Sequence, residues 1–235
     1  MLTHPLQTIL GDIPAHWNRR QLKEVLLPKE CCSGDWGEDH GERPLKVLRS
    51  TNFTNDGHLD LSDTEIRWFP QTTIDHLQPK TGDILLERSG GGPDQPVGRV
   101  VFIYVDMPGF GFGNFIQRLR PNAELVVPRY LRWVLHELHR SGIIERLQHQ
   151  TTQMRNLDYR DYIRVYIPVP PEDEQQHIAD AIEHCDKLVL KMKTMIGIRG
   201  SLHRDQMGGA LNRLKKSLLQ NLLTGKVLTT PESPT

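Results

Sequence analysis

The sequence lacks the features of several protein classes. It has no run of about 18 apolar residues, which a membrane-spanning helix requires, and no apolar stretch behind a basic start, which a secretory signal requires. Of its three cysteines, Cys31 and Cys32 are adjacent and Cys185 is far away, so their spacing matches neither a disulfide framework nor a zinc site. We therefore expect a cytoplasmic protein.

The sequence also has no net charge, because its 29 Lys and Arg residues balance its 29 Asp and Glu residues. Strong nonspecific attraction to phosphate groups is therefore not expected. The first 171 residues nevertheless contain 16 Arg and only 4 Lys. The planar guanidinium group suits bidentate contacts with guanine and phosphate, although an arginine-rich composition more often reflects genomic bias. The charge leaves nucleic-acid binding open without indicating it.

Three prolines within residues 167–171 mark the most distinct boundary in the chain. Prolines end a preceding strand or helix and keep the backbone extended. Acidic residues follow at 172–174, where they favour a helix N-terminus. Apolar residues then recur at alternating steps of four and three. After a break at Gly197 and Gly200, a second such run closes before Gly225, a residue typical of a helix C-cap.

These steps are typical of a coiled-coil seam. We expect a long helical arm that pairs with another helix, although two amphipathic helices packed on the chain's own domain would show the same periodicity. The length favours an arm, because residues 172–196 would extend about 37 Å as a helix. The residues expected to contact a partner helix are Ile178, Ile182, Val189, Met192, Ile196, Leu211, Leu214, Leu218 and Leu222.

The first part of the chain mixes strand and helix patterns, so the predicted fold class is α+β: a mixed α/β domain followed by the helical arm. A helix is expected from Arg129 to about His139, after Pro128, with a continuation over residues 142–148. The expected strands are 44–49, 83–87, 98–105, 115–119 and 162–167. The expected parts are a domain at 1–171, an arm at 172–228 and a disordered tail at 229–235.

Three candidate catalytic patterns are incomplete. The glycine-rich segment 109–113 follows a strand pattern, as in a methyltransferase, but continues as a strand rather than as a helix. Asp83 and Glu87 could begin a nuclease magnesium site, but arginine and serine stand where lysine is needed. Segment 89–93 lacks the Gly-Lys-Ser/Thr ending of a phosphate-binding loop. No histidine has metal-ligand spacing, so we expect no catalytic or metal site.

Three polar segments follow or precede the expected strands, at 49–52, 88–89 and 148–156. Asn and Gln can bond adenine bidentately, Arg can bond guanine, and Thr can contact the thymine methyl group or a phosphate. Solvated loops would have the same composition, so that alternative stays open. If the segments read a DNA groove, the contacting residues would be Arg49, Ser50, Asn52, Arg88, Ser89, Gln150, Thr152, Gln153, Arg155 and Asn156.

Two motifs flank the arm. Residues 166–179 read YIPVPPEDEQQHIA, and residues 214–227 read LKKSLLQNLLTGKV. They are similar to the signature I-P-x-P-P-x-x-E-Q-x-x-I-A and to the closing motif L-K-x-x-L-L-x-x-L-L-T-G-K of one family. Weaker similarities occur at 11–14 with Trp17, at 82–85, at 88–91 and at 151–153. Over nearly its whole length, the chain therefore resembles the specificity subunits of type I restriction–modification systems.

The resemblance implies a target-recognition domain at residues 1–171, which reads a few base pairs of double-stranded DNA, chiefly in the major groove. It implies that the arm acts as a ruler and as a docking surface for methyltransferase subunits. The chain itself would be non-catalytic and would bind no cofactor. S-adenosylmethionine would be held by the methyltransferase subunits, which flip the target base. ATP and magnesium would be held by a restriction subunit, where one is present.

The chain departs from the family in one respect. Typical members carry two recognition domains and two arms, whereas this sequence has one of each and looks like a half-length specificity subunit. Two copies could pair their arms antiparallel and read inverted half-sites at a fixed spacing. The alternative function is an assembly scaffold with a coiled-coil arm and no DNA binding.

Overall fold

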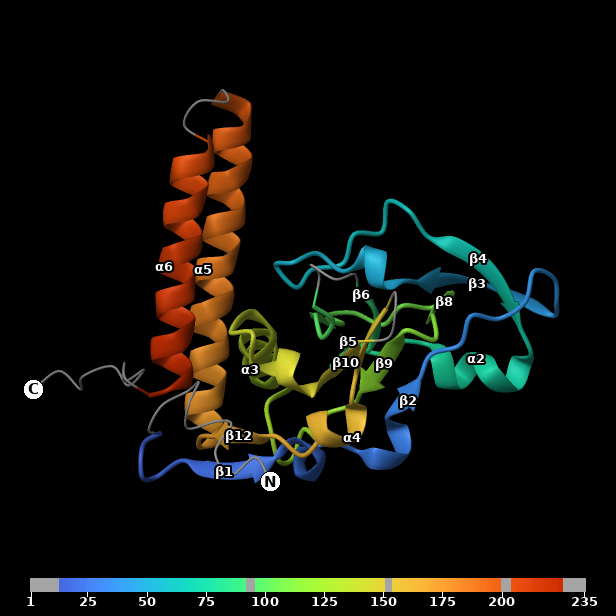
Figure 1. The fold of residues 1–235 in the computed structure, drawn as a ribbon, viewed down its shortest axis with the longest axis horizontal. Coiled ribbons are helices and arrows are strands. Elements are labelled where there is room, and N and C mark those ends of the chain that lie inside the picture. The colour runs from blue at the N-terminus through green and yellow to red at the C-terminus, as the bar shows by residue number, and fades with distance from the viewer. Residues whose placement is uncertain (1–12, 92–95, 151–153, 200–203, 226–235) are drawn as a thin grey trace, which may run out of the picture. The chain divides into compact units, whose positions relative to one another are not determined.

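The computed structural model describes residues 13–91, 96–150, 154–199 and 204–225 (Figure 1); for residues 150, 193–199 and 204–212 it describes the backbone alone. Contacts within the chain divide it into two units. Residues 20–167 form one unit, and the described residues before and after this range form the other. The second boundary falls at Pro168, inside the proline-rich segment. No sequence pattern indicated that the residues before Arg20 group with the helices.

Two helices, α5 (Glu172–Arg199) and α6 (Arg204–Leu223), pack against each other as an antiparallel hairpin (Figure 1). The break expected at Gly197 is wrong, because α5 continues through this residue. A glycine inside a helix costs only about 1 kcal/mol relative to alanine. Gly200 lies outside the described residues. The end of α6 is as predicted: Gly225 has a φ of 67°, and its N–H donates to the Leu222 carbonyl at 3.2 Å.

Part of the predicted seam is buried within this chain. A buried ion pair between Lys215 and Asp186 joins the two helices. Four of the seam residues are buried in the described structure, where α5 packs against α6 of the same chain, so their side chains are not available to a helix of another chain. These residues and their exposures are Ile178 at 1%, Ile182 at 1%, Val189 at 7% and Leu222 at 3%.

The other described seam side chains are more exposed to solvent. Met192 and Leu214 are exposed at 42% and 67%, and Leu218 is half-buried. The side chains of Ile196 and Leu211 lie outside the described residues. The predicted seam therefore contains residues buried between α5 and α6 and also residues that solvent reaches.

Residues from three parts of the sequence meet at the base of the hairpin. Trp17 Nε1 donates to a Glu174 carboxylate oxygen at 2.9 Å. A Cβ added to Gly225 would lie 2.4 Å from Pro14 Cγ, so only glycine permits this approach. The two motifs that flank the arm thus contact the same N-terminal segment.

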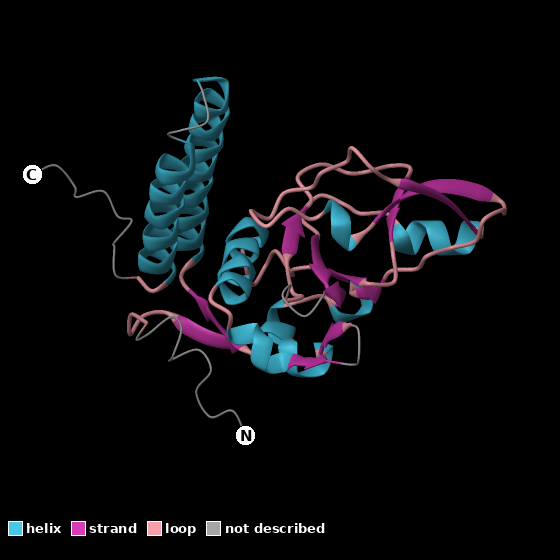
Figure 2. Ribbon diagram, turned by 45° about the horizontal axis from the view of Figure 1, so that its top comes forward, coloured by secondary structure: helices cyan, strands magenta, loops and turns pink. Residues whose placement is uncertain are grey.

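The unit of residues 20–167 consists of short strands joined by long loops (Figure 2). Sheet β2-β9-β5-β7 is antiparallel, and sheet β4-β3-β8 is mixed, because β3 is parallel to β8. A third sheet has the order β10-β11-β6, and β1 pairs with β12. The strands are β1 Asn18–Gln21, β2 Cys32–Ser33, β3 Arg43–Leu48, β4 Glu65–Phe69, β5 Ile84–Glu87, β6 Ser89–Gly91, β7 Val100–Phe102, β8 Phe110–Phe112, β9 Ile116–Leu119, β10 Gln148–Gln150, β11 Arg155–Leu157 and β12 Tyr166–Val169.

Among the described residues, none of the chain's helices combines the length and apolar character that crossing a bilayer takes.

The unit of residues 20–167 contains short helices between its strands. The α-helices are α2 Gln71–Leu77, α3 Pro128–Arg140 and α4 Tyr159–Tyr162, and the 3-10 helices are η1 Leu22–Val25, η2 Pro28–Glu30, η3 Ser50–Asn52 and η4 Ile143–Leu147.

The mixed helix-and-strand fold predicted from the sequence is confirmed. The strands expected over 44–49, 83–87, 98–105 and 115–119 correspond to β3, β5, β7 and β9, although β7 is shorter than expected. Strands β4 and β8 were not predicted. The strand expected at 162–167 begins only at Tyr166.

Two local hydrogen-bonding patterns explain the differences near the end of this unit. Asp158 caps α4 by accepting a bond from the Asp161 N–H at 3.1 Å, so Tyr162 is helical rather than extended. Helix α3 corresponds to the predicted helix, but its continuation is a 3-10 helix. Gly142, with a φ of 76°, ends α3 and allows the chain to turn.

Sheets β2-β9-β5-β7 and β4-β3-β8 share one apolar core, to which their strands, helix α2 and the adjoining segments contribute side chains. Burying these side chains stabilises the fold by about 1.5–3 kcal/mol for each large residue. The core cluster comprises Leu45, Val47, Leu48, Phe53, Phe69, Leu77, Leu85, Val101, Ile103, Phe112 and Ile116.

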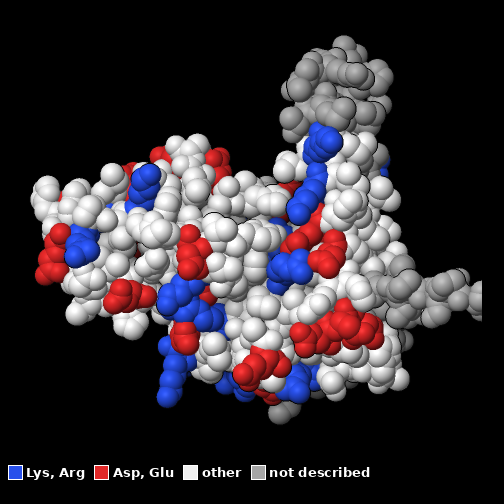
Figure 3. Space-filling model, turned by 180° about the vertical axis from the view of Figure 1, so that it is seen from behind, with Lys and Arg blue, Asp and Glu red and all other residues white. Residues whose placement is uncertain are grey.

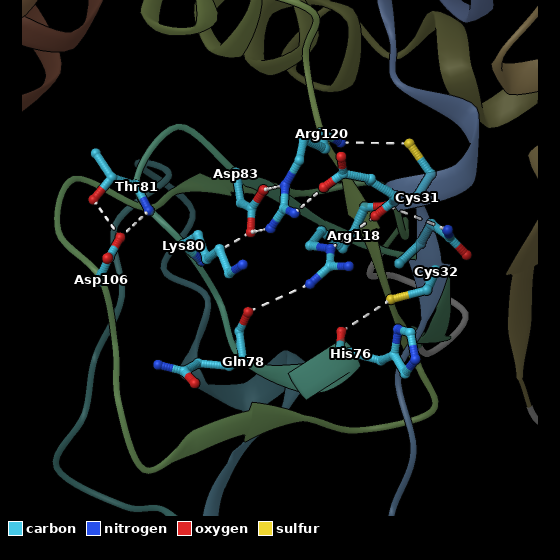
Figure 4. Close-up of polar contacts among 12 residues, drawn as sticks. Cys31, Cys32, His76, Gln78, Lys80, Thr81, Asp83, Asp106, Arg118 and Arg120 are labelled. Carbon is cyan, nitrogen blue, oxygen red and sulfur yellow. Dashed lines mark hydrogen bonds and ion pairs between the residues drawn. The ribbon is translucent and has the colours of Figure 1, made fainter. Parts of the chain in front are cut away.

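Several arginines serve the scaffold and not the surface. Arg120 bonds Asp83 through Nε at 2.6 Å and Nη2 at 2.8 Å, and it also pairs with Glu30 (Figure 4). Arg118, which is 4% exposed, donates to the carbonyls of Glu30 and Gln78 at 3.0 and 3.3 Å. Arg118 and Arg120 thus tie loops to the core.

Candidate nucleic-acid interface

Two of the predicted polar segments are joined by a small sheet. Strand β6 pairs antiparallel with β11, with Asn156 opposite Ser89 and an irregularity between Arg155 and Asn156. Ser89 Oγ donates to Asn156 Oδ1 at 2.7 Å, and the Leu157 N–H donates to the Arg88 carbonyl at 2.8 Å. The segments at 88–89 and 155–156, far apart in sequence, therefore present their side chains side by side.

The third polar segment lies against the same sheet. Gly90 has a φ of 102°, and a Cβ added there would lie 3.3 Å from Ser50 Oγ and 3.2 Å from Phe115 Cδ2. This backbone conformation favours glycine, and the added Cβ would also be crowded by the two side chains. The three segments predicted separately are thus neighbours in the fold. We call this group of residues, Ser50, Ser89, Arg155 and Asn156, the polar face.

A buried ion pair holds the Ser50 segment in place. Arg99 donates to Glu87 through Nε at 2.8 Å and Nη2 at 2.7 Å. Its Nη1 donates to the Phe53 carbonyl at 2.5 Å, and Nη2 also donates to the Ser50 carbonyl at 3.0 Å. Arg99 is 9% exposed and Glu87 is 1% exposed. Both ends of the turn 50–53 are therefore tied to strand β5 through one guanidinium group.

Arg88 is half-buried beside the polar face. Its Nη1 donates to Ser33 Oγ at 3.0 Å and Gln117 Oε1 at 3.1 Å, and its guanidinium lies 5.5 Å from the centre of the Tyr159 ring. Burial raises the pKa of Tyr159 to about 12. The side chain of Arg88 is therefore held in a defined orientation.

One predicted DNA contact, Asn52, is corrected, and a second, Arg49, has acidic neighbours. Asn52 is 2% exposed; its Nδ2 donates to the carbonyls of Asp60 and Asp63, and its Oδ1 accepts from the Arg49 N–H at 2.7 Å. The prediction of a base contact is wrong for Asn52, because its polar atoms are used inside the turn. Arg49 pairs with Asp63 at 2.7 Å and Glu65 at 3.3 Å, so it neutralises neighbouring acids.

The predicted polar stretch 148–156 is a hairpin rather than a loop. Strands β10 and β11 pair antiparallel, with Gln148 opposite Leu157 and Gln150 opposite Arg155. Of the predicted contacts in this stretch, Arg155 and Asn156 are half-buried. Thr152, Gln153 and the side chain of Gln150 lie outside the described residues.

The sequence prediction missed a pocket that adjoins the polar face. It has a volume of about 390 Å³ and is lined by Trp36, the turn 49–51 and the turn 113–116. Asn114 is exposed, and Phe115 is 37% exposed. The Gly-Asn pair at 113–114, typical of a turn between strands, was the available signal.

The candidate catalytic groups are engaged within the scaffold. Asp83 is bonded by Arg120 and Glu87 by Arg99, so neither carboxylate faces an open metal site. The described part of the chain contains no group of three or more His, Cys, Asp or Glu residues that could hold a metal ion. Segment 89–91 is strand β6 and not a phosphate loop, and segment 109–113 leads into β9 and not into a helix.

Comparisons with known proteins agree with the resemblance found in the sequence. No protein-family model matches the chain. A curated type I restriction enzyme specificity subunit, MjaX of Methanocaldococcus jannaschii, is 24% identical over 221 residues, which cover 93% of this chain and 48% of that protein. The resemblance to type I specificity subunits is thus confirmed by a curated relative.

Solved structures show the same fold. The HsdS subunit of Thermoanaerobacter tengcongensis matches with a TM-score of 0.57 and 17% identity, over 87% of this chain and 49% of that chain. The S subunit of a type I restriction–modification system from M. genitalium matches with a TM-score of 0.52 and 18% identity, over 87% and 48%. The chain therefore spans about half the length of the relatives that it matches.

Proposed function

We propose that the chain acts as a DNA-target specificity module of a type I restriction–modification assembly and is itself non-catalytic. The observation that carries the proposal is that Ser50, Ser89, Arg155 and Asn156, from three distant segments of the sequence, are neighbours in the fold. Their hydroxyl, amide and guanidinium groups are those that bond base edges in the major groove. The likeness to specificity subunits supports the same role.

The surface charge favours sequence reading over nonspecific attraction. On the face shown in Figure 3, Lys and Arg side chains lie among Asp and Glu side chains. Phosphate contacts supply affinity in proportion to unopposed positive charge, whereas base contacts supply specificity. We therefore propose that the isolated chain binds DNA weakly, and that a methyltransferase carrying S-adenosylmethionine completes the binding surface.

The experiment that tests this function is a binding assay on the chain with its methyltransferase, followed by sequencing of the methylated sites. One short motif should be methylated, and duplexes carrying it should bind more tightly than scrambled duplexes. A scaffold without DNA contacts predicts the same affinity for both. The chain alone should transfer no methyl group.

Replacing polar-face residues should relax one position of the target. Asn156→Ala and Arg155→Ala should each cost about 1–3 kcal/mol of binding to the correct base, because each good base contact is worth that much. Methylated-site sequencing should then show a degenerate base at one position. Asn55→Ala and Arg43→Ala alter exposed side chains elsewhere and serve as matched controls. Unchanged preference in both test variants would remove these residues from the site.

We further propose that two copies pair through one side of the helical hairpin. Leu188 and Leu214, exposed at 47% and 67%, each directly precede a buried residue of α5 or α6. In an antiparallel pair such positions lie on the same side of the hairpin, because a twofold axis perpendicular to its plane relates them. Met192 and Leu218 follow one turn later on the same side. This exposed strip suits a second hairpin, and two copies would read inverted half-sites.

Polar residues on this strip should weaken pairing. Leu188→Gln with Leu214→Gln should reduce self-association at least tenfold, since burying one leucine contributes about 1.5–3 kcal/mol. Mass in solution, measured with and without the methyltransferase, tests this expectation, and Leu61→Gln is the control at a 45% exposed leucine outside the helices. A wild-type chain that stays monomeric in both states would rule out pairing.

A further inference from the structure

The pocket beside Ser50 is larger than the space that a group on a base edge would occupy. Its volume of about 390 Å³ exceeds the space for a thymine methyl group and falls within the range of about 300–1,000 Å³ for small-molecule pockets. Three separate segments of the chain line it. The pocket therefore has room for an aromatic ring system.

Two of its walls are aromatic. Phe115 is 37% exposed, and its ring rests on Gly90 of strand β6. Arg67 contacts Trp36 in two ways. Its guanidinium lies 5.2 Å from the centre of the indole ring, and its Nε donates to the Trp36 carbonyl at 3.2 Å. A Cβ added to Gly113 would lie 3.4 Å from Trp36 Cε3, so the ring is also packed against this turn. Oriented aromatic rings of this kind stack on nucleobases.

The remaining lining residues can read a base. Ser50 and Thr51 carry hydroxyl groups, and Asn114 carries an amide; each can donate to and accept from base edges. Ser50 belongs both to the pocket and to the polar face, and a Cβ added to Gly90 would lie 3.3 Å from its hydroxyl oxygen. A base that leaves the duplex at the polar face would thus meet the pocket directly.

We propose that this pocket receives one nucleobase turned out of the duplex, stacked on Phe115 and Trp36 and bonded by Ser50, Thr51 or Asn114. This inference rests on the proposed function and adds a ligand to the same site. The displaced base is distinct from the base that the methyltransferase modifies. Unpairing opposes such displacement, so a mismatch opposite the displaced base lowers the cost of binding.

The test uses the complex of this chain with its methyltransferase and duplexes carrying the mapped target with one mismatched pair at a time. A mismatch at the methylated base should tighten binding through the methyltransferase. At one further position a mismatch should also tighten binding, on the order of tenfold. Phe115→Ala should abolish only this second gain. Tyr104→Ala, at a 48% exposed aromatic residue outside the pocket, should retain both gains.

Phe115→Leu keeps an apolar side chain without the aromatic face and should behave as Phe115→Ala does. It serves as the test variant if Phe115→Ala does not fold. If every mismatch away from the methylated base weakens wild-type binding, or if both Phe115 variants keep the second gain, no base enters the pocket. Sequence-specific binding would then still support the proposed function. If the complex shows no sequence preference, the proposed function fails and the pocket assignment fails with it.

Discussion

Arg99→Met should lower the free energy of unfolding of the chain by about 3–5 kcal/mol, the usual cost of leaving one member of a buried ion pair unpartnered. Glu87, at 1% exposure, would lose both of its bonds to the guanidinium group. The carbonyls of Ser50 and Phe53 would lose their donor at the same time. Urea unfolding measures the loss, and Arg43→Met, at an exposed position on β3, provides the control.

The double variant Glu87→Leu with Arg99→Met separates two roles of this arginine. Removing both charges should restore most of the stability, because apolar residues of similar volume often replace a buried pair without cost. The turn 50–53 would still lack its anchor, so methylated-site sequencing should show relaxed target preference in a folded protein. Normal preference in the double variant would show that Arg99 acts on stability alone and does not position Ser50.

Lys215→Ala should destabilise the helical hairpin by a similar amount, about 3–5 kcal/mol, the usual cost of removing one member of a buried ion pair. The side chains of the two partners are only 9% and 10% exposed. The loss should appear as earlier melting of the helical circular-dichroism signal. The adjacent Lys216 is exposed, and Lys216→Ala should change stability by no more than about 0.5 kcal/mol.

Replacing the pair with apolar residues tests whether the effect is electrostatic. Asp186→Leu with Lys215→Met should recover the wild-type unfolding midpoint or exceed it. If Lys215→Ala melts with the wild type, the ion pair does not hold the hairpin together. A double variant as unstable as Lys215→Ala would instead place the cost in side-chain packing.

The proline-rich signature shows how much local sequence can predict. Its glutamine, Gln175, is 3% exposed and donates to the Pro170 carbonyl at 2.8 Å, which closes the turn into α5. Its glutamate, Glu174, instead bonds Trp17 from the other end of the chain. The helix start was therefore predictable from neighbouring residues, whereas the partner of Glu174 depended on a contact between distant segments.

At the candidate site, too, local sequence predicted the residue types, whereas contacts between distant segments decided their positions. Their amide, hydroxyl and guanidinium groups were evident in the sequence, and three of the segments do converge. Asn52 was indistinguishable from Asn156 by residue type and loop position. Folding buries Asn52 beneath its own turn and leaves Asn156 half-buried on β11. Burial depends on which strands pair, and that pairing is not encoded within one segment.

Local sequence by itself determined the helices α5 and α6, the strands β3, β5, β7 and β9 and the likeness to specificity subunits, because periodicity, capping residues and turns act over a few neighbouring residues. Only the tertiary structure decided that α5 pairs with α6 of the same chain, that Arg99 anchors Ser50, and that Trp36 and Phe115 share a pocket. Each of these depends on contacts between residues far apart in sequence, whose formation requires the whole core to close.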